Sequence, residues 1–176
     1  MYKILQIAII TILCDQLSKL TMLYLLDLPS VGIIDVFPPY LQFTMAWNYG
    51  VNFGLFANST EIMRWVLIII AFLICFVVIR WSVSEKFGSL GLVACGFLVG
   101  GAAGNAIDRF FHGAVVDFLN VSCCGISNPF AFNVADIFIF LVLLDWLYFQ
   151  ANRMRVTEAV SSVNIEIKFR MVFYVL

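Results

Sequence analysis

The chain has 176 residues, of which 63% are hydrophobic, 16% aromatic and 12% charged, and its mean hydropathy is +1.02. A water-soluble domain of this size cannot bury so much apolar surface, so the composition predicts an integral membrane protein. The formal net charge is -1 and the 10 basic residues are scattered, which excludes a nucleic-acid partner.

Four apolar runs, each about long enough to cross a bilayer, predict an all-α polytopic membrane protein with four transmembrane helices. They cover residues 4–26, 62–81, 87–107 and 130–149. The first run is interrupted by Asp15 and Lys19, which a helix places on one face. There the two charges partly neutralise each other and turn toward the interior of the bundle. The same interruption argues against a cleavable signal peptide.

The connection formed by residues 27–60 is too long for a tight turn. It contains three prolines, and apolar residues alternate with smaller or polar ones over residues 41–47. This pattern predicts a small β-strand cradle on the extracytoplasmic surface of the membrane. Gly50 and Gly54 follow it and suit a turn or a close backbone approach.

Basic residues predict the orientation of the chain. The segments 27–60 and 110–152 contain no Lys or Arg. Five basic residues lie instead beside span ends on the other side: Lys3, Arg80, Lys86, Arg153 and Arg155. By the positive-inside rule both termini are cytoplasmic, and the loop joining the third and fourth spans is outside.

The third span carries a ridge of small residues. Gly96, Gly100 and Gly104 recur at every fourth position, so another helix backbone can approach closely. The same helix then brings three polar side chains to the extracytoplasmic surface of the membrane: Asn105, Asp108 and Arg109. A tight helix pair is expected to hold these groups in place.

Asp117 and Asp136 are the strongest candidates for chemistry. An Asp at the centre of a membrane helix costs roughly 2.5–3.5 kcal/mol, so it is seldom kept without a use. Asp117 is expected in the loop before the fourth span, and Asn133 and Asp136 share one helical face at its outer end. The predicted topology gathers a polar cluster at that surface: Asp15, Asn48, Asn105, Asp108, Arg109, Asp117, Asn133 and Asp136.

Two carboxylates brought close together share a proton, as in aspartic proteases. One then acts as general base toward water while the other donates to the substrate carbonyl, and no metal is needed. In the alternative, Asp117 and Asp136 are satisfied separately, by Arg109 or by helix-end amides. Two further pairs are interpreted as structural ion pairs that support the site: Asp15 with Lys19, and Asp108 with Arg109.

The cysteines do not form a metal-binding pattern. Three of them are interpreted as small hydrophobes in apolar runs, namely Cys14, Cys75 and Cys95. Cys123 and Cys124 lie in a loop, and His112 is the one histidine, so the spacing predicts no metal site.

The ordered motifs resemble those of the bacterial lipoprotein signal peptidases (signal peptidase II). They are residues 15–19, 48–54, 100–109, 116–118 and 132–136, so the resemblance extends from Met1 to about Gln150. It implies a four-helix membrane aspartic endopeptidase of residues 1–155, without a cofactor. Such an enzyme cuts a prolipoprotein just before its diacylglyceryl-modified cysteine.

By motif position, Asp117 and Asp136 match the catalytic dyad of this family. The other matching positions are implied to orient the dyad or engage the substrate: Asp15, Lys19, Asn48, Gly50, Gly104, Asn105, Asp108, Arg109 and Asn133. The implied partners are diacylglyceryl-prolipoproteins, membrane phospholipid and the inhibitor globomycin. The implied location is the bacterial inner membrane, with the active site at the periplasmic face.

The chain departs from the family pattern at two places. Val51 and Asn52 stand where the family often has two alanines, and the tail of residues 156–176 extends beyond the usual end and inherits no role. A competing class is a small transporter or proton-relay protein that uses its intramembrane carboxylates. A noncatalytic scaffold is the third class, and it predicts that both Asp can be replaced without loss of processing.

Overall fold

The structure is a computed structural model that describes residues 1–50, 60–122 and 128–156. The loop positions Val51 and Asn52, the cysteines Cys123 and Cys124, and the tail from residue 157 onward lie outside the described residues.

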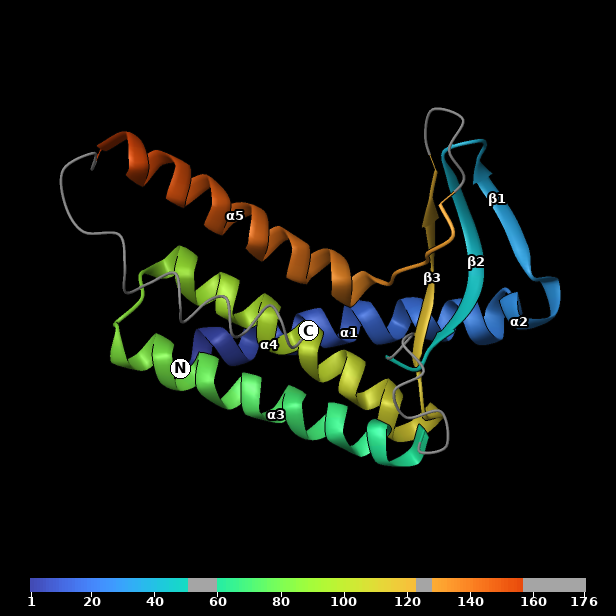
Figure 1. Cartoon of the computed structure of the whole chain (residues 1–176), viewed down its shortest axis with the longest axis horizontal. Coiled ribbons are helices and arrows are strands. Elements are labelled where there is room, and N and C mark those ends of the chain that lie inside the picture. Colours follow the sequence, from blue (N-terminus) through green and yellow to red (C-terminus); the bar gives the residue numbers. More distant parts are fainter. Residues whose placement is uncertain (51–59, 123–127, 157–176) are drawn as a thin grey trace.

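Long helices form a bundle, and a small sheet stands across one of its ends (Figure 1). The first helix, α1, continues through a π-helical segment, η1, and a short helix, α2, follows. In chain order the helical elements are α1 Tyr2–Leu20, η1 Thr21–Leu25, α2 Leu28–Val31, α3 Thr60–Ser84, α4 Ser89–His112 and α5 Val134–Val156.

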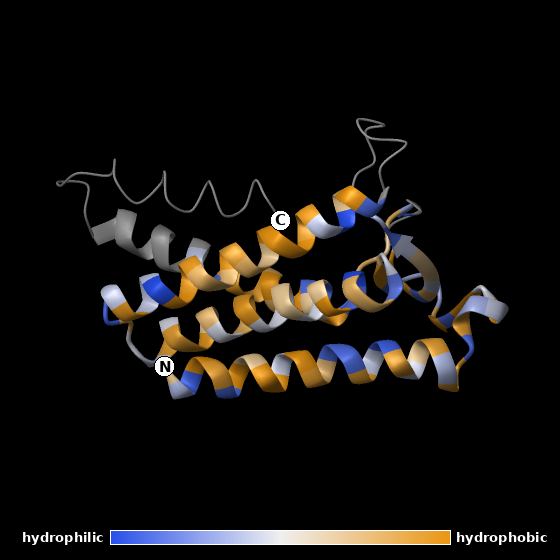
Figure 2. Ribbon diagram, turned by 90° about the horizontal axis from the view of Figure 1, so that it is seen from below, coloured by the Kyte–Doolittle hydropathy of each residue, from blue (hydrophilic) through white to orange (hydrophobic). Residues whose placement is uncertain are grey.

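Within the part of the chain that the structure describes, three helices are long and apolar enough to cross a membrane: Tyr2–Leu25, Glu61–Ser84 and Ser89–His112. They correspond to the first three predicted spans. Hydrophobic residues cover much of the helical surface, and hydrophilic residues lie toward both ends of the bundle, including the end where the helices approach the sheet (Figure 2). The protein is therefore a multi-pass membrane protein, and α5 as a fourth span stays a prediction.

The glycine ridge of α4 packs against α1, as the sequence predicts. A Cβ at Gly96 would lie 2.5 Å from Cβ of Ile7, and one at Gly100 would lie 2.8 Å from the carbonyl oxygen of Ala8. Either contact is closer than real Cβ atoms allow, so glycine is what lets the two backbones approach. This close packing brings the polar residues of α1 against those of α4.

The sheet contains three antiparallel strands in the order β1 (Ile33–Phe37), β2 (Leu41–Asn48) and β3 (Val115–Val121). The predicted strand at residues 41–47 is confirmed as β2. Asp117 was expected in a loop, and that expectation is wrong: it lies in β3 and pairs with Ala46. The reason is that β3 forms a buried strand against β2, a partner far away in the sequence.

The last helix begins later than predicted, at Val134 rather than residue 130. Phe132 exchanges backbone hydrogen bonds with Leu119 of β3, so this part of the chain is extended. Asn133 and Asp136 then cap the helix reciprocally. The amide of Asp136 donates to Oδ1 of Asn133 at 3.1 Å, and the amide of Asn133 donates to Oδ2 of Asp136 at 3.1 Å.

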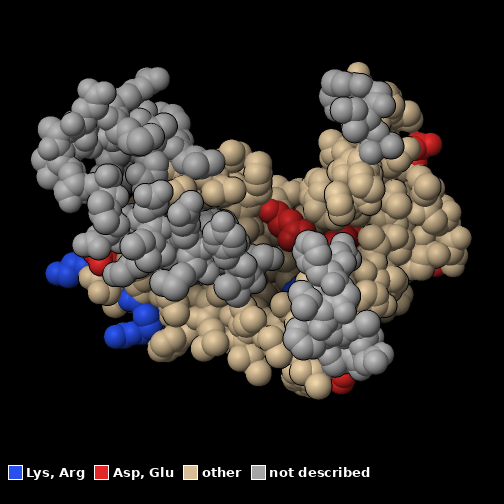
Figure 3. All heavy atoms as spheres, viewed as in Figure 1, with Lys and Arg blue, Asp and Glu red and all other residues tan. Residues whose placement is uncertain are grey.

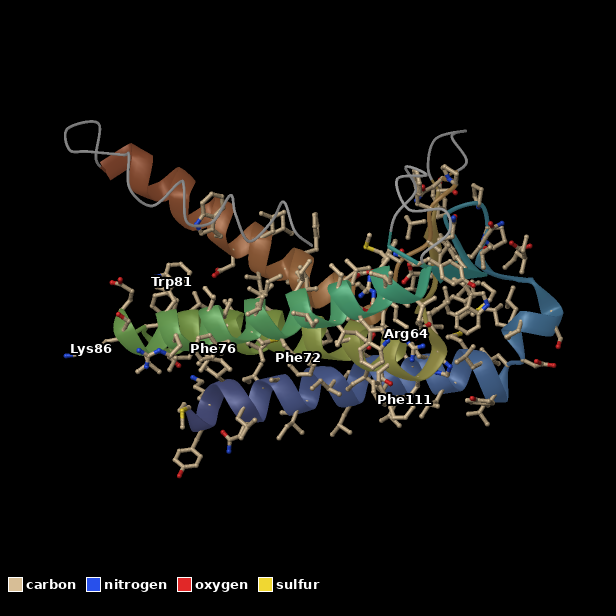
Figure 4. All side chains as sticks on the ribbon, turned by 60° about the horizontal axis from the view of Figure 1, so that its bottom comes forward. Arg64, Phe72, Phe76, Trp81, Lys86 and Phe111 are labelled. Carbon is tan, nitrogen blue, oxygen red and sulfur yellow. The ribbon has the colours of Figure 1, made fainter. Side chains whose placement is uncertain are left out.

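Most of the basic residues on the face drawn in Figure 3 lie at the end of the bundle opposite the sheet. The space-filling view shows Lys and Arg gathered at that end (Figure 3). Lys86 is labelled there in Figure 4, whereas Arg64 and Phe111 lie near the sheet. The Nζ of Lys3 donates to Oγ of Ser89, which joins the N-terminal ends of α1 and α4.

Candidate active site

Side chains from α1, β2, α4, β3 and α5 meet where the bundle joins the sheet. Acidic atoms are visible there in the hollow between α5 and the sheet (Figure 3). Hydrogen bonds or ion pairs join eight of the predicted site residues: Asp15, Lys19, Asn48, Asn105, Asp108, Asp117, Asn133 and Asp136. Gly50, Gly104 and Arg109 lie directly beside them.

Asn133 bridges the two candidate catalytic carboxylates. Its Nδ2 donates to Oδ1 of Asp117 at 2.7 Å, and its backbone amide donates to Oδ2 of Asp136 at 3.1 Å. Asn133 is 0% exposed, so water does not compete for these bonds. The helix cap of α5 therefore also couples Asp136 to Asp117.

Asn48 holds the other oxygen of Asp117. Its Nδ2 donates to Oδ2 of Asp117 at 3.0 Å, and its Oδ1 accepts the amide of Gly50 at 2.9 Å. Gly50 has a φ of +86°, which L side chains rarely adopt, and a Cβ there would also meet Cδ1 of Leu67. Only glycine suits this turn, which in return orients the Asn48 amide toward the carboxylate.

Asn105 of α4 completes the shell around the dyad. Its Nδ2 donates to Oδ1 of Asp136 at 3.2 Å, and its Oδ1 accepts Nδ2 of Asn133 at 3.2 Å. Each oxygen of both carboxylates thus accepts a hydrogen bond from a described group. Neither carboxylate is free to rotate without losing one of these bonds.

Asp117 is 2% exposed. Burial, and after it the nearby charge of Asp136, raise the pKa of its carboxyl to about 6 in all. Hydrogen bonds from Asn133 and Asn48 oppose this rise, as does the charge of Lys19. A carboxyl in these surroundings can hold a proton in the pH range where enzymes work.

Buried ion pairs lie beneath the dyad. Lys19 Nζ lies 2.7 Å from Oδ2 of Asp15, as expected, and 2.7 Å from Oδ2 of Asp108. The expected pair of Asp108 with Arg109 is wrong: among the described residues, Asp108 forms its ion pair with Lys19. Adjacent helical residues do not face each other, and Arg109 instead points toward Gly50 and the cavity described below.

Gln16 is a site residue that the sequence reasoning missed. Its Nε2 lies 2.8 Å from Oδ1 of Asp108, 3.2 Å from Oδ2 of Asp15 and 3.3 Å from the carbonyl oxygen of Gly104. A Cβ at Gly104 would lie 2.7 Å from Oδ2 of Asp15. The signal that could have found Gln16 was a polar side chain within a span, next to Asp15.

A cavity of about 340 Å³ opens beside Asp136. Its polar lining is Asn48, Asn105, Arg109 and Asp136, and its apolar lining is Leu67, Ile70, Ala71, Ala102, Val115, Ile139, Phe140 and Leu143. The polar groups are those around the dyad, and the apolar ones come mostly from α3 and α5. A ligand in this cavity would be apolar over most of its length and polar where it meets Asp136.

Comparisons with known proteins agree with this description. The family described as signal peptidase (SPase) II matches residues 7–151. A lipoprotein signal peptidase of Methylobacterium sp. (strain 4-46) is 40% identical over 126 residues, which are 72% of this chain and 74% of that protein. A lipoprotein signal peptidase of Caulobacter vibrioides is 37% identical over 153 residues, 84% of this chain and 88% of that protein.

The fold is also found among solved structures. A bacterial membrane enzyme solved by the in meso method at 2.3 Å resolution superposes with a TM-score of 0.72 and 23% identity, covering 93% of this chain and 96% of that one. This likeness shows the fold, and the sequence matches show the family. The chain therefore belongs to the signal peptidase II family, whose members are membrane peptidases of bacteria.

Proposed function

We propose that this peptidase removes the signal peptide from diacylglyceryl-modified prolipoproteins, cutting just before the lipidated cysteine, and that Asp117 and Asp136 are its catalytic dyad. The observation that carries the proposal is that Asn133 bridges the two carboxylates, one of which, Asp136, lines a mostly apolar cavity. Membership of the family supports the substrate class. It also weighs against a transporter that uses the same carboxylates.

The proposed reaction divides the work between the two carboxyl groups. Asp136 lines the cavity, so it takes a proton from the attacking water as the oxygen bonds to the scissile carbonyl carbon. Asp117, the more buried group with the raised pKa, gives its proton to the carbonyl oxygen. On collapse, Asp136 returns its proton to the leaving amine of the cysteine, and Asp117 recovers one from the hydroxyl as the C–N bond breaks.

The surrounding residues have supporting roles in this scheme. Asn48, Asn105 and Asn133 donate hydrogen bonds to the dyad carboxylates. Asp15 and Asp108 accept the backbone amides just before the dyad residues, and Lys19 pairs with both of these supporting carboxylates. Arg109 lines the cavity with a cation that can bind a substrate carbonyl. The glycines at positions 50 and 104 allow the close approaches on which this packing depends.

The proposed orientation puts the dyad at the periplasmic face of the inner membrane, with α5 as the fourth span and both termini in the cytoplasm. Support comes from the basic residues at the end of the bundle far from the sheet. A reporter fused after Arg155 is expected to be cytoplasmic, and one inserted after Ser30 extracytoplasmic. Alkaline phosphatase and fluorescent-protein fusions measure this, and the reverse result at either position contradicts the orientation.

The aspartic mechanism predicts a pH dependence. As the pH rises through about 6, Asp117 loses the shared proton, so kcat/KM of the free enzyme is expected to fall. The substitution Asn48→Ala removes a hydrogen bond that lowers the pKa of Asp117. The fall of kcat/KM with rising pH is therefore expected to move to higher pH in this variant. The measurement is kcat/KM for a lipidated peptide across the pH range.

The control for the pH experiment is Gln42→Ala. Gln42 bonds Asp35 on the outer hairpin, and the change leaves the groups around Asp117 intact. Its profile is expected to coincide with that of the unaltered enzyme. An Asn48→Ala profile that moves to lower pH, or does not move, contradicts the assignment of the proton to Asp117.

A further inference from the structure

The turn between β1 and β2 exposes two stacked aromatic rings. Phe37 is 63% exposed and Tyr40 is 47% exposed, and their ring centroids lie 5.7 Å apart with an interplanar angle of 23°. Two prolines stand between them, and the amide of Tyr40 donates to the carbonyl oxygen of Phe37 at 2.8 Å. Residues 37–40, the hairpin tip, therefore present an apolar surface on a backbone that the prolines and this hydrogen bond restrict.

The polar groups of the hairpin are satisfied behind the hairpin tip. Oδ1 of Asp35 accepts Nε2 of Gln42 at 2.7 Å, and the carbonyl oxygen of Tyr40 accepts the amide of Ser122 at 2.9 Å. The sequence contains no charged residue between Asp35 and Glu61. The hairpin tip thus contains no charge that would favour water around its rings.

Exposed aromatic rings also lie at the ends of α3 and α4 next to the sheet. Trp65 of α3 contacts Phe110 of α4 edge to face at 6.0 Å, and Phe110 contacts Phe111 in the same way at 5.2 Å. All three side chains are exposed, and Phe111 is labelled near the sheet in Figure 4. Aromatic residues gather at the boundary between membrane and water, so these rings indicate where the bilayer surface surrounds the bundle.

The hairpin tip lies close to this level, beside the bundle rather than beyond it. The strands run across the long axis of the helices, and the hairpin tip lies on the same side as α5 (Figure 1). Along that axis it lies no farther out than α2. An apolar surface at this level, to the side of a membrane bundle, faces the lipid headgroups and the first part of the acyl chains.

We propose that the hairpin tip is a membrane-binding site, in which Phe37 and Tyr40 insert between the phospholipids of the leaflet next to the sheet. The rings leave water for the acyl chains, and the hydroxyl of Tyr40 stays among the headgroups. The hairpin tip then anchors the sheet at a point outside the membrane-spanning helices. The anchor goes beyond the proposed function and does not rest on it, because it requires no catalytic role for any residue of the sheet.

The test places a fluorescent reporter at the hairpin tip. Phe37→Trp is reconstituted into phosphatidylcholine vesicles whose acyl chains carry bromine, which quenches tryptophan on contact. The chain already has 4 Trp, so the signal of the added tryptophan is the difference from the unaltered protein. We expect this signal to lose most of its intensity in brominated vesicles and to be insensitive to iodide in the water.

Ile33→Trp is the matched control. Ile33 is 57% exposed, on the same strand as Phe37, at the end next to α2. Its added tryptophan is expected to be quenched by iodide and not by bromine. Equal quenching by bromine at both positions would mean that the whole strand lies in lipid, and the hairpin tip would not be the anchor.

Two other results for Phe37→Trp overturn the proposal. Quenching by iodide alone would place the hairpin tip in water. Protection from both quenchers would mean that protein covers it, as in contact with a second copy of the chain.

A second measurement tests whether the hairpin tip holds the sheet. In vesicles, Phe37→Ser/Tyr40→Ser is expected to make the backbone amides of β2 exchange hydrogen at least about tenfold faster, because the sheet opens more often without its anchor. Ile33→Ser, at the other end of β1, is expected to leave this exchange unchanged. Equal exchange in the double variant and the unaltered protein contradicts the anchor, whatever the activity of the enzyme.

Discussion

Replacing Asp117→Asn or Asp136→Asn is expected to remove nearly all cleavage while leaving a folded protein in the membrane. Either amide keeps the volume of the side chain but cannot carry the shared proton, and each proton transfer contributes on the order of 10²–10⁴ in rate. Initial rates on a lipidated prolipoprotein, at matched protein level in detergent or lipid, measure the effect. Ordinary turnover by either variant would mean abandoning the aspartic mechanism.

The double variant Asp117→Asn/Asp136→Asn sharpens this test. Residues that act as a unit lose function non-additively, so the double variant is expected to be little slower than either single one. Asp145→Asn is the matched control, because Asp145 lies farther along α5 and lines no part of the cavity given for the dyad. It is expected to keep substantial activity.

The helices that position the site follow from composition and spacing. Hydropathy predicts four spans, and within the described residues the structure confirms the first three of them as helices long and apolar enough to cross a membrane. The repeat of Gly96, Gly100 and Gly104 predicts a close helix partner, and α1 is that partner. Both inferences depend on local properties of the chain, which a single sequence records directly.

The environment of Asp117 depends on a distant partner, and the sequence reasoning missed it. A short segment such as residues 116–118 becomes a strand because β2, far away in the chain, pairs with it. The choice of Lys19 rather than Arg109 as the partner of Asp108 has the same origin. The ion pair depends on which face of α1 packs against α4, and the adjacency of Asp108 and Arg109 in the sequence does not reveal this packing.

The gathering of the polar residues was nevertheless predictable, and their exact bonds were not. The predicted orientation and span order place Asn105, Asp117 and Asp136 at one membrane face. Asn133 both caps a helix and bridges the dyad, and this double role depends on where α5 begins. Helix boundaries are among the features that are hardest to predict from a sequence. Gln16 shows the same limit, because its three contacts arise only when α1 packs on α4.

The shape of the cavity gives a reason to expect that lipid modification is required. Its walls are apolar along α3 and α5 and become polar at Asp136. A diacylglyceryl chain gains little free energy when it moves from the bilayer to the protein, since both surroundings are apolar. We therefore infer that the main effect of the lipid is to hold the scissile bond of the substrate at the depth of the dyad. A larger side chain in the lining, which narrows the cavity, should therefore impair the reaction.

Ala71→Leu tests the cavity, and Phe72→Leu is its neighbour and control. Ala71 is 7% exposed and lines the cavity, whereas Phe72 is 66% exposed and is not among the residues that line it. We expect Ala71→Leu to lower kcat/KM on the lipidated substrate by about tenfold, as overpacking of a filled site does, and Phe72→Leu to leave it unchanged. Equal effects of the two changes would show that the cavity is not where the substrate binds.

A substrate in which Ser replaces the lipidated Cys is expected to be processed at least about 100-fold more slowly, because it lacks the group that holds the scissile bond beside the dyad. The measurement incubates purified enzyme with modified and unmodified prolipoprotein and looks for a cut before the cysteine position. A Cys-containing substrate that has not been lipidated controls for the Ser change and is expected to be equally slow. If the unmodified chain is cut as fast as the lipidated one, the lipid does not position the substrate, and the apolar walls beside Asp136 have another role.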